Sequence, residues 1–306
     1  MWGKETCTKA RRTNAKRTSA PRRSMESKRP FKSSGRAINK MIAADTMKIL
    51  ADKKYLNDQE AEVDLSASLE FAINNTVLYD GGTCGKFQTR HDTKIEVTSE
   101  TTIEALTRIS DNDDDSVDIF VLNFASGRNP GGGFLRGAQA QEESIAKVSG
   151  LYPCLETQHE SFYMPNRRSH SPFYTDNVIY SPKVPVFRRD NGDLLDTPIL
   201  ASIASCAAVN AGGNLESEIV AANTKRMRLV LRVAAMHKHD VLILGAIGCG
   251  VFRNNPSDIA RIWKKLLTTD TDLVGRFRRI CFAVYDTTKD KNVLRSFRLA
   301  LSGHKG

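Results

Sequence analysis

The chain has 306 residues, of which 40% are hydrophobic and 26% are charged, a composition typical of soluble proteins with one large domain or two modest ones. No run of 18 apolar residues occurs, which excludes a membrane-spanning helix, and the first residues lack the apolar stretch of a secretory signal, so we expect an intracellular protein. The six cysteines include no CxxC pair, and their spacing predicts neither a disulfide framework nor a structural metal.

The formal charge of +10 is concentrated at the N-terminus. Residues 1–40 contain 13 Lys or Arg against Glu5 and Glu26, or +11, so the other residues, with 32 basic and 33 acidic side chains, carry −1. Residues 1–34 also lack apolar periodicity, which predicts a disordered basic tail. Such a tail is either a solvated extension or a nuclear-import, nucleic-acid-binding or organelle-transit segment, which leaves cytoplasm and nucleus both open as locations.

From residue 35 onward, helical and strand patterns alternate along the chain. Apolar residues three and four apart predict a helix from about residue 38, and a second helix is expected over 58–73, so that residues 35–75 form an N-terminal helical part. Further strands are expected at 95–97, 117–124, 178–180, 199–204, 241–244 and 280–284. Further helices are expected at 101–109, from about 138, and at 215–236, 257–267 and 291–301. This alternation favours a single α/β domain over 35–306, with a parallel or mixed sheet covered on both faces.

A glycine triplet follows the expected strand at 117–124. Pro130 precedes Gly131, Gly132 and Gly133, which together remove every Cβ from the loop at the carboxyl end of a strand, where open α/β sheets bind ligands. The first turn of the next expected helix holds Gln141, Glu142 and Glu143. Two carboxylates beside a crevice open to backbone approach suggest acid–base chemistry.

A second glycine loop follows the expected strand at 241–244. Gly245, Gly248 and Gly250 would leave backbone amides free to point at phosphate oxygens, and the helix expected from residue 257 adds the positive end of its dipole. The loop lacks the GxxxxGK[ST] and GxGxxG patterns, which disfavours a Walker-type kinase and a dinucleotide-binding fingerprint. This loop therefore predicts a diphosphate cradle.

Three glycines, a gap of seven residues and then Gln-Glu-Glu resemble the signature of poly(ADP-ribose) glycohydrolases. The surrounding NFASGRNPGGGFLRGAQAQEES resembles their bacterial-type, microbial branch, as do residues 178–187 and 245–252, so the resemblance covers roughly residues 38–301. It implies a macrodomain-like fold, a mixed sheet flanked by helices on both faces with an N-terminal helical extension. It also implies hydrolysis of the ribose–ribose O-glycosidic bond of poly(ADP-ribose), releasing ADP-ribose from chain ends without a metal or cofactor.

The resemblance further implies roles for individual residues. Glu143 would be the acid on the glycosidic oxygen, and Glu142 would hold the hydroxyls of a terminal ribose lying over the glycine triplet. Asn123 and Gln141 would orient the same sugar. The remaining implied contacts are diphosphate binding by the amides of Gly248, Cys249, Gly250 and Val251, ribose packing by Phe252, and adenine stacking by Tyr285 or Phe282. Ser126 stands where the animal enzymes carry an asparagine, which supports the microbial branch.

Three alternatives stay open at this point. The same fold could bind ADP-ribose without cleaving it, although such a reader needs no paired carboxylates. A related hydrolase could remove single ADP-ribosyl units from protein or nucleic acid. A nucleic-acid-associated scaffold acting through the tail is disfavoured by the nearly neutral core. The expected substrates are poly(ADP-ribose) or ADP-ribosylated protein, the tail offers a nucleic-acid contact, no membrane partner is expected, and the oligomeric state is left open.

Overall fold

The computed structural model describes residues 35–81, 91–112, 117–212 and 216–301. The chain divides into two units, Met1–Lys32 and Ser33–Gly306, and all described residues belong to the second. The basic tail predicted at 1–34 lies outside the described residues. The expectation of disorder and of a nucleic-acid contact there therefore stays a prediction.

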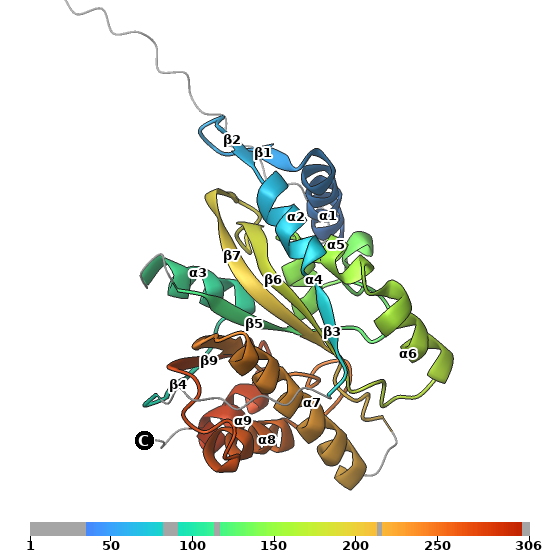
Figure 1. Cartoon of the computed structure of the whole chain (residues 1–306), viewed down its shortest axis with the longest axis vertical. Coiled ribbons are helices and arrows are strands. Elements are labelled where there is room, and N and C mark those ends of the chain that lie inside the picture. The colour runs from blue at the N-terminus through green and yellow to red at the C-terminus, as the bar shows by residue number, and fades with distance from the viewer. Residues whose placement is uncertain (1–34, 82–90, 113–116, 213–215, 302–306) are drawn as a thin grey trace, which may run out of the picture. The chain divides into compact units, whose positions relative to one another are not determined.

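A mixed seven-stranded sheet forms the centre of the second unit (Figure 1). In spatial order its strands are β3 (Val77–Tyr79), β6 (Val178–Arg188), β7 (Leu194–Cys206), β5 (Ile119–Phe124), β8 (Val241–Leu244), β9 (Arg279–Ala283) and β4 (Lys94–Thr98). The five strands from β7 to β4 are parallel, whereas β6 and β3 join antiparallel at one edge. This arrangement confirms the predicted α/β class with a mixed sheet.

Helices cover both faces of the sheet, each over its own apolar core. One core contains Trp263 and Phe282 and is covered by α7 (Glu216–Met236), α8 (Pro256–Thr269) and α9 (Asn292–Leu301). The other is covered by α2 (Ser66–Asn74), α3 (Thr102–Asn112), α4 (Gln141–Ala146) and α5 (Leu151–Glu156). β5 and β8 are buried on both faces, so neither alternates between apolar and polar residues: β8 is apolar throughout and β5 is apolar except for Asn123. The remaining helical segments are α1 (Gly35–Asp52), η1 (Phe134–Arg136), η2 (His159–Tyr163) and α6 (Met164–Ser169).

Helix α1 packs on the segment that follows the glycine triplet. Phe134 of η1 is buried between Ala43 of α1 and Ala146 of α4. The Thr46 hydroxyl donates to the carbonyl of Lys147 at 2.5 Å. The N-terminal helical part therefore supports the loop from which catalytic residues are expected, besides covering apolar surface.

Several expected elements have other bounds in the structure, such as the strand expected at 199–204, which spans Leu194–Cys206. Two of the differences have a clear local cause. The helix expected over 58–73 begins only at Ser66, because the Asn57 side chain accepts the amides of Gln59 and Ala61 and so closes a turn. That turn joins the strands β1 (Lys54–Leu56) and β2 (Glu62–Asp64). The strand expected at 178–180 continues to residue 188, because a register shift at Ser181/Val184 accommodates the chain past its prolines.

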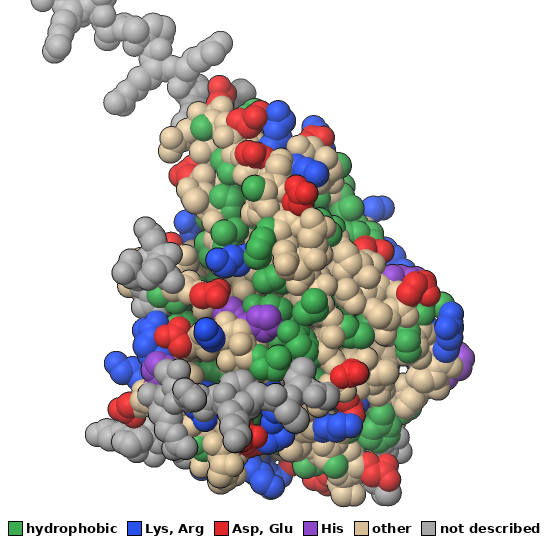
Figure 2. Space-filling view, viewed as in Figure 1, with side chains coloured by type: hydrophobic (Ala, Val, Ile, Leu, Met, Phe, Trp, Pro, Cys, Tyr) green, Lys and Arg blue, Asp and Glu red, His purple; other side chains and the backbone are tan. Residues whose placement is uncertain are grey.

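On the face of the second unit shown in Figure 2, acidic and basic side chains are interspersed and neither sign of charge dominates. This agrees with the nearly balanced charge counted outside the first 40 residues. Among the helices that the structure describes, none has the length and apolar character needed to cross a bilayer.

We predict that Gly137→Ala destabilises the domain by roughly 1–3 kcal/mol, the cost of a non-glycine residue in the left-handed region. Gly137 has φ +73°, and a Cβ there would collide with the carbonyl oxygen of Arg36 in α1. Urea unfolding measures the loss. The matched control is Gly35→Ala, since nothing lies within 4 Å of a Cβ at that position, and equal stability of the two variants would contradict the close approach of α1.

Candidate functional site

A cleft of about 750 Å³ lies at the carboxyl ends of β5, β8 and β9. Neighbouring parallel strands end at this edge of the sheet, so the loops that follow them meet there. Most of the predicted site residues line the cleft: Gly132, Gly133, Gln141, Glu142, Glu143, Gly248, Cys249, Gly250, Val251, Phe252 and Tyr285. Three predicted residues do not line it, namely Asn123, Gly131 and Gly245.

The glycine triplet brings its backbone against both carboxylates. Gly131 and Gly132 have φ of +63° and +60°, which favour glycine. A Cβ on Gly132 would lie 2.5 Å from Oε1 of Glu143 and 3.0 Å from Oε2 of Glu142. The two acids can therefore sit at the floor of the cleft only because this position has no side chain.

Glu143 presents a carboxylate that is anchored on one side. Its Oε1 accepts the backbone amide of Gly133 at 2.9 Å. Within the described part of the chain no donor reaches its Oε2, and the side chain is partly exposed in the cleft. One oxygen is thus fixed in place while the other remains available to a ligand.

Glu142 is in a different environment, although it is the adjacent residue. It is 3% exposed, and its Oε2 accepts the amide of Ser126 at 2.7 Å while Oε1 lies 3.4 Å from Nδ2 of Asn123. Burial raises the pKa of Glu142 to about 8, and the Ser126 amide offsets part of that effect while the charge of Glu143 adds to it. At neutral pH the buried acid therefore largely keeps its proton.

Asn123 and Gln141 both bond to protein groups around the acids. Asn123 is fully buried and donates to the Ser205 hydroxyl at 2.9 Å. The Gln141 amide accepts from the Phe124 backbone at 2.8 Å and donates to the Leu122 carbonyl at 2.8 Å, which ties the start of α4 to the end of β5. Sequence reasoning missed Ser205, because only the pairing of β5 with β7 brings it beside Asn123.

The second glycine loop offers backbone amides to the cleft, as expected of a diphosphate cradle. No acceptor among the described residues takes the amides of Gly248, Gly250, Val251 and Phe252. The Cys249 amide differs, because it donates to the carbonyl of Ala246 at 3.2 Å. The Cys249 amide, which the resemblance implies for diphosphate binding, is therefore already hydrogen-bonded within its own loop.

Two buried asparagines, which the sequence did not single out, hold this loop in shape. Nδ2 of Asn254 donates to the carbonyls of Val209 and Gly248, at 2.8 and 3.0 Å. Its Oδ1 accepts from Asn223 of α7 at 2.8 Å, and Asn223 in turn accepts the Val209 amide. The loops after β7 and β8 are thereby fixed to each other. No local motif marks such residues, whose partners come from three separate segments.

The two aromatic residues proposed for adenine stacking occupy opposite environments. Tyr285 follows β9, lines the cleft and is 64% exposed. Phe282 is fully buried, with its ring 6.0 Å from Trp263 and 5.8 Å from Phe297. Of these two residues only Tyr285 can present a ring face to a ligand, so the alternative of Phe282 was wrong. Phe252, at the other wall, has its ring 5.9 Å from that of Tyr174.

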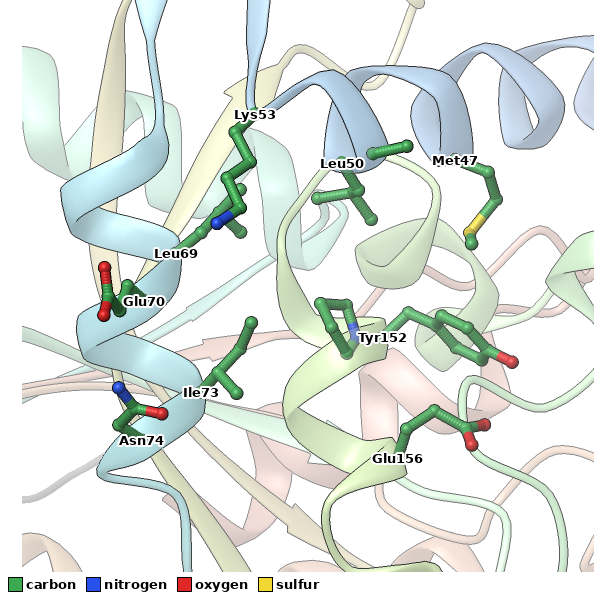
Figure 3. A pocket seen from close by; sticks show the side chains of 11 residues that line it. Met47, Leu50, Lys53, Leu69, Glu70, Ile73, Asn74, Tyr152 and Glu156 are labelled. Carbon is green, nitrogen blue, oxygen red and sulfur yellow. The ribbon is translucent and has the colours of Figure 1, made fainter.

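A second hollow of about 570 Å³ lies between α1, α2 and α5 (Figure 3). Met47, Leu50 and Ile73 line it together with the stem of Lys53. None of the predicted site residues borders it. The acids, the free amides and the exposed aromatic ring converge in the other cleft, which is therefore the candidate active site.

Comparison with known proteins agrees with this geometry. A family model described as the catalytic domain of microbial-type PARG matches residues 43–189. The solved poly(ADP-ribose) glycohydrolase of Thermomonospora curvata superposes with a TM-score of 0.81 at 36% identity, covering 87% of this chain and 100% of that one. No curated protein sequence matches the chain.

Two ligand-bound structures are also similar. The T. curvata enzyme bound to the inhibitor ADP-HPD gives a TM-score of 0.79 at 36% identity, covering 86% of this chain and 99% of that chain. The poly(ADP-ribose) glycohydrolase of Deinococcus radiodurans in complex with ADP-ribose gives 0.68 at 41% identity, covering 76% of this chain and 97% of that chain. The chain belongs to the microbial-type poly(ADP-ribose) glycohydrolase family.

Within this glycohydrolase the family model spans the glycine triplet and both acids but ends before the second glycine loop. The structural matches extend over 76–87% of the chain. The fold and family that the motifs suggested are therefore confirmed, whereas the roles of individual site residues remain to be tested.

We predict that Glu142 makes the stability of the domain fall as pH rises from about 4.5 to about 8. In that range the folded protein holds a proton on Glu142 that the unfolded chain, with the ordinary glutamate pKa of 4.5, has lost. Folding then takes up a proton, so rising pH disfavours it, and the effect levels off above the folded pKa. Urea midpoints at pH 5, 7 and 9 measure this dependence.

The comparison variant is Glu142→Gln, which keeps the shape but cannot ionise. Relative to the wild type it should become more stable as pH increases from 5 to 9. A difference between the two proteins that did not change with pH would show that the buried carboxyl is ionised throughout.

Proposed function

We propose that Glu143 is the general acid with which this glycohydrolase cleaves the ribose–ribose O-glycosidic bond of poly(ADP-ribose) and releases ADP-ribose from chain ends. The observation that carries the proposal is the difference between the two adjacent acids. Glu143 reaches the cleft with one oxygen anchored on the Gly133 amide and the other open, while Glu142 is buried. A proton donor has to reach the leaving oxygen, and of the two adjacent acids Glu143 has the carboxyl oxygen that is open to the cleft.

The reaction follows from this placement. Cleavage passes through an oxocarbenium-like state in which negative charge develops on the leaving ribose oxygen, and Glu143 gives that oxygen its proton. The same carboxylate, now ionised, then accepts a proton from the water that attacks the anomeric carbon. Glu142 cannot serve as the opposing carboxylate, because adjacent residues of a helix point about 100° apart.

Glu142 contributes by its protonation and its position. With its proton retained at neutral pH, Glu142 adds no negative charge beside the bound diphosphate. Its carboxyl borders the cleft above Gly132, where we place the hydroxyls of the terminal ribose. Asn123 and Ser126 act on the sugar through Glu142, as positioning residues.

The rest of the ADP-ribose unit extends from the acids to the end of β9. Free amides of Gly248, Gly250 and Val251 would bind the diphosphate. The exposed ring of Tyr285 would stack on the adenine. These contacts account for the length of the cleft from α4 to β9.

Glu143→Gln should reduce turnover by ~10²- to 10⁴-fold while leaving ADP-ribose binding nearly unchanged, because the amide cannot donate a carboxylic proton but preserves size and polarity. The assay follows ADP-ribose released from poly(ADP-ribose) and the chain lengths that remain. Glu70→Gln, an exposed change on α2 outside the cleft, is the control. Turnover by Glu143→Gln at the control rate would rule out the assignment, and oligomers as the only products would rule out cleavage at chain ends.

Tyr285→Ala should weaken ADP-ribose binding about tenfold, the scale of one lost base–aromatic stack. Tyr285→Phe keeps the ring and should bind as the wild type does. Calorimetric titration with ADP-ribose distinguishes stacking from a role of the hydroxyl. If both variants bind ADP-ribose as tightly as the wild type does, the adenine does not lie on this residue.

A further inference from the structure

The cleft contains one cation among its described lining residues, and that cation is not beside the amides. Arg136 of η1 lines the cleft on the Glu143 side, while Glu142, Glu143 and Asp286 are the acidic lining residues. A ligand with several phosphates would gain most from a cation in the cleft. Arg136, the one cation among the described lining residues, is thus separated from the proposed diphosphate cradle.

Arg136 is exposed, and within the described residues no carboxylate pairs with it. A second guanidinium lies next to the same turn, because Nε of Arg36 in α1 donates to the carbonyl of Arg136 at 3.1 Å. The described residues offer no carboxylate to Arg36 either. An anion that approaches this turn therefore meets two arginines whose charge no described carboxylate neutralises.

The close approach of α1 to the turn that holds Arg136 is built into the backbone. Gly137, which follows Arg136, leaves no room for a Cβ against the Arg36 carbonyl. Burial of Phe134 against Ala43 fixes η1 on α1 from below. The backbone from which Arg136 projects is therefore held firmly against α1.

The orientation of the bound polymer determines which of its groups lies near Arg136 and Arg36. In the proposed orientation the terminal unit runs from Glu143 to Tyr285, so the scissile bond lies at Glu143 and the rest of the polymer leaves the cleft on the opposite side from β9. Arg136 lines the cleft and follows β5, which β8 separates from β9 in the sheet, so it lies on that side. Resting on that proposed function, we propose that Arg136, with Arg36 beside it, binds the diphosphate of the second ADP-ribose unit, which departs with the glycosidic oxygen.

This assignment makes the arginine pair a specificity element. A polymer or a two-unit fragment carries the second diphosphate, whereas ADP-ribose alone and a single unit linked to protein do not. Arg136 and Arg36 therefore strengthen binding of the polymer and of the two-unit fragment, and they contribute nothing to binding of ADP-ribose or of a single protein-linked unit. The arginine pair thus favours polymer over single ADP-ribosyl units without touching the reacting atoms.

The test measures affinity for ADP-ribose and for its linear dimer by calorimetry, using the full chain with Glu143→Gln so that the dimer stays intact. We expect the dimer to bind about three- to tenfold more tightly than ADP-ribose, the scale of one or two exposed guanidinium–phosphate pairs. Arg136→Ala should abolish this excess and leave the ADP-ribose affinity unchanged. Arg136→Lys should retain part of the excess, and salt should reduce it.

Arg298→Ala, an exposed arginine of α9 outside the cleft, is the matched control and should leave both affinities unchanged. The inference would be overturned if Arg136→Ala still bound the dimer more tightly than ADP-ribose, or if the parent protein showed no such difference. It would also be overturned if Arg136→Ala lost affinity for ADP-ribose to the same extent as for the dimer. Cleavage of the dimer by the chain with Glu143 intact tests the proposed function separately. An Arg136-dependent excess without cleavage would refute only that function, and cleavage without an Arg136 effect on binding would refute only this inference.

Discussion

The active site depends on the close contact between the backbone of the glycine triplet and two adjacent carboxyl groups. Gly132 lies so close to Glu142 and Glu143 that any Cβ would displace them. Because the backbone takes this path, one amide of the triplet, that of Gly133, is turned toward Glu143. The buried acid and the partly exposed acid then follow from a single turn of helix, since one residue faces the β5 strand and the next faces the cleft.

The order of the strands converts this local arrangement into a complete binding site. β5 lies between β7 and β8, so the loops after all three strands meet. Asn223 and Asn254 connect the loops after β7 and β8, and Ser205 on β7 supports Asn123 on β5. The two acids and the free amides of the second glycine loop are thereby held at a fixed separation by the sheet.

Much of the fold could be predicted from the sequence, because buried parallel strands such as β8 are continuous apolar runs, and glycine loops mark their carboxyl ends. The Gly131–Gly133 and Gln141–Glu143 motifs are local, so they identified the site as well. What could not be predicted depends on contacts between distant segments. Nothing near Glu142 in sequence indicates its burial, which requires Ser126 and Asn123 around it. The Cys249 amide bonds within its own loop, a detail of turn geometry that glycine spacing does not specify.

The docking of α1 on the catalytic segment has a consequence for how the enzyme forms. The hydrogen bond from Arg36 to Arg136 joins residues 100 positions apart, and that from Thr46 to Lys147 joins residues 101 apart. Closing such long loops costs chain entropy before any contact compensates for it, so these contacts are expected late in folding. Pairings at the edges of the sheet join residues at least as far apart, such as Val77 with Tyr180 and Lys94 with Arg279. Helix α1 and the sheet edges are therefore expected to reach their places at a similar stage, and activity then reports that both have done so.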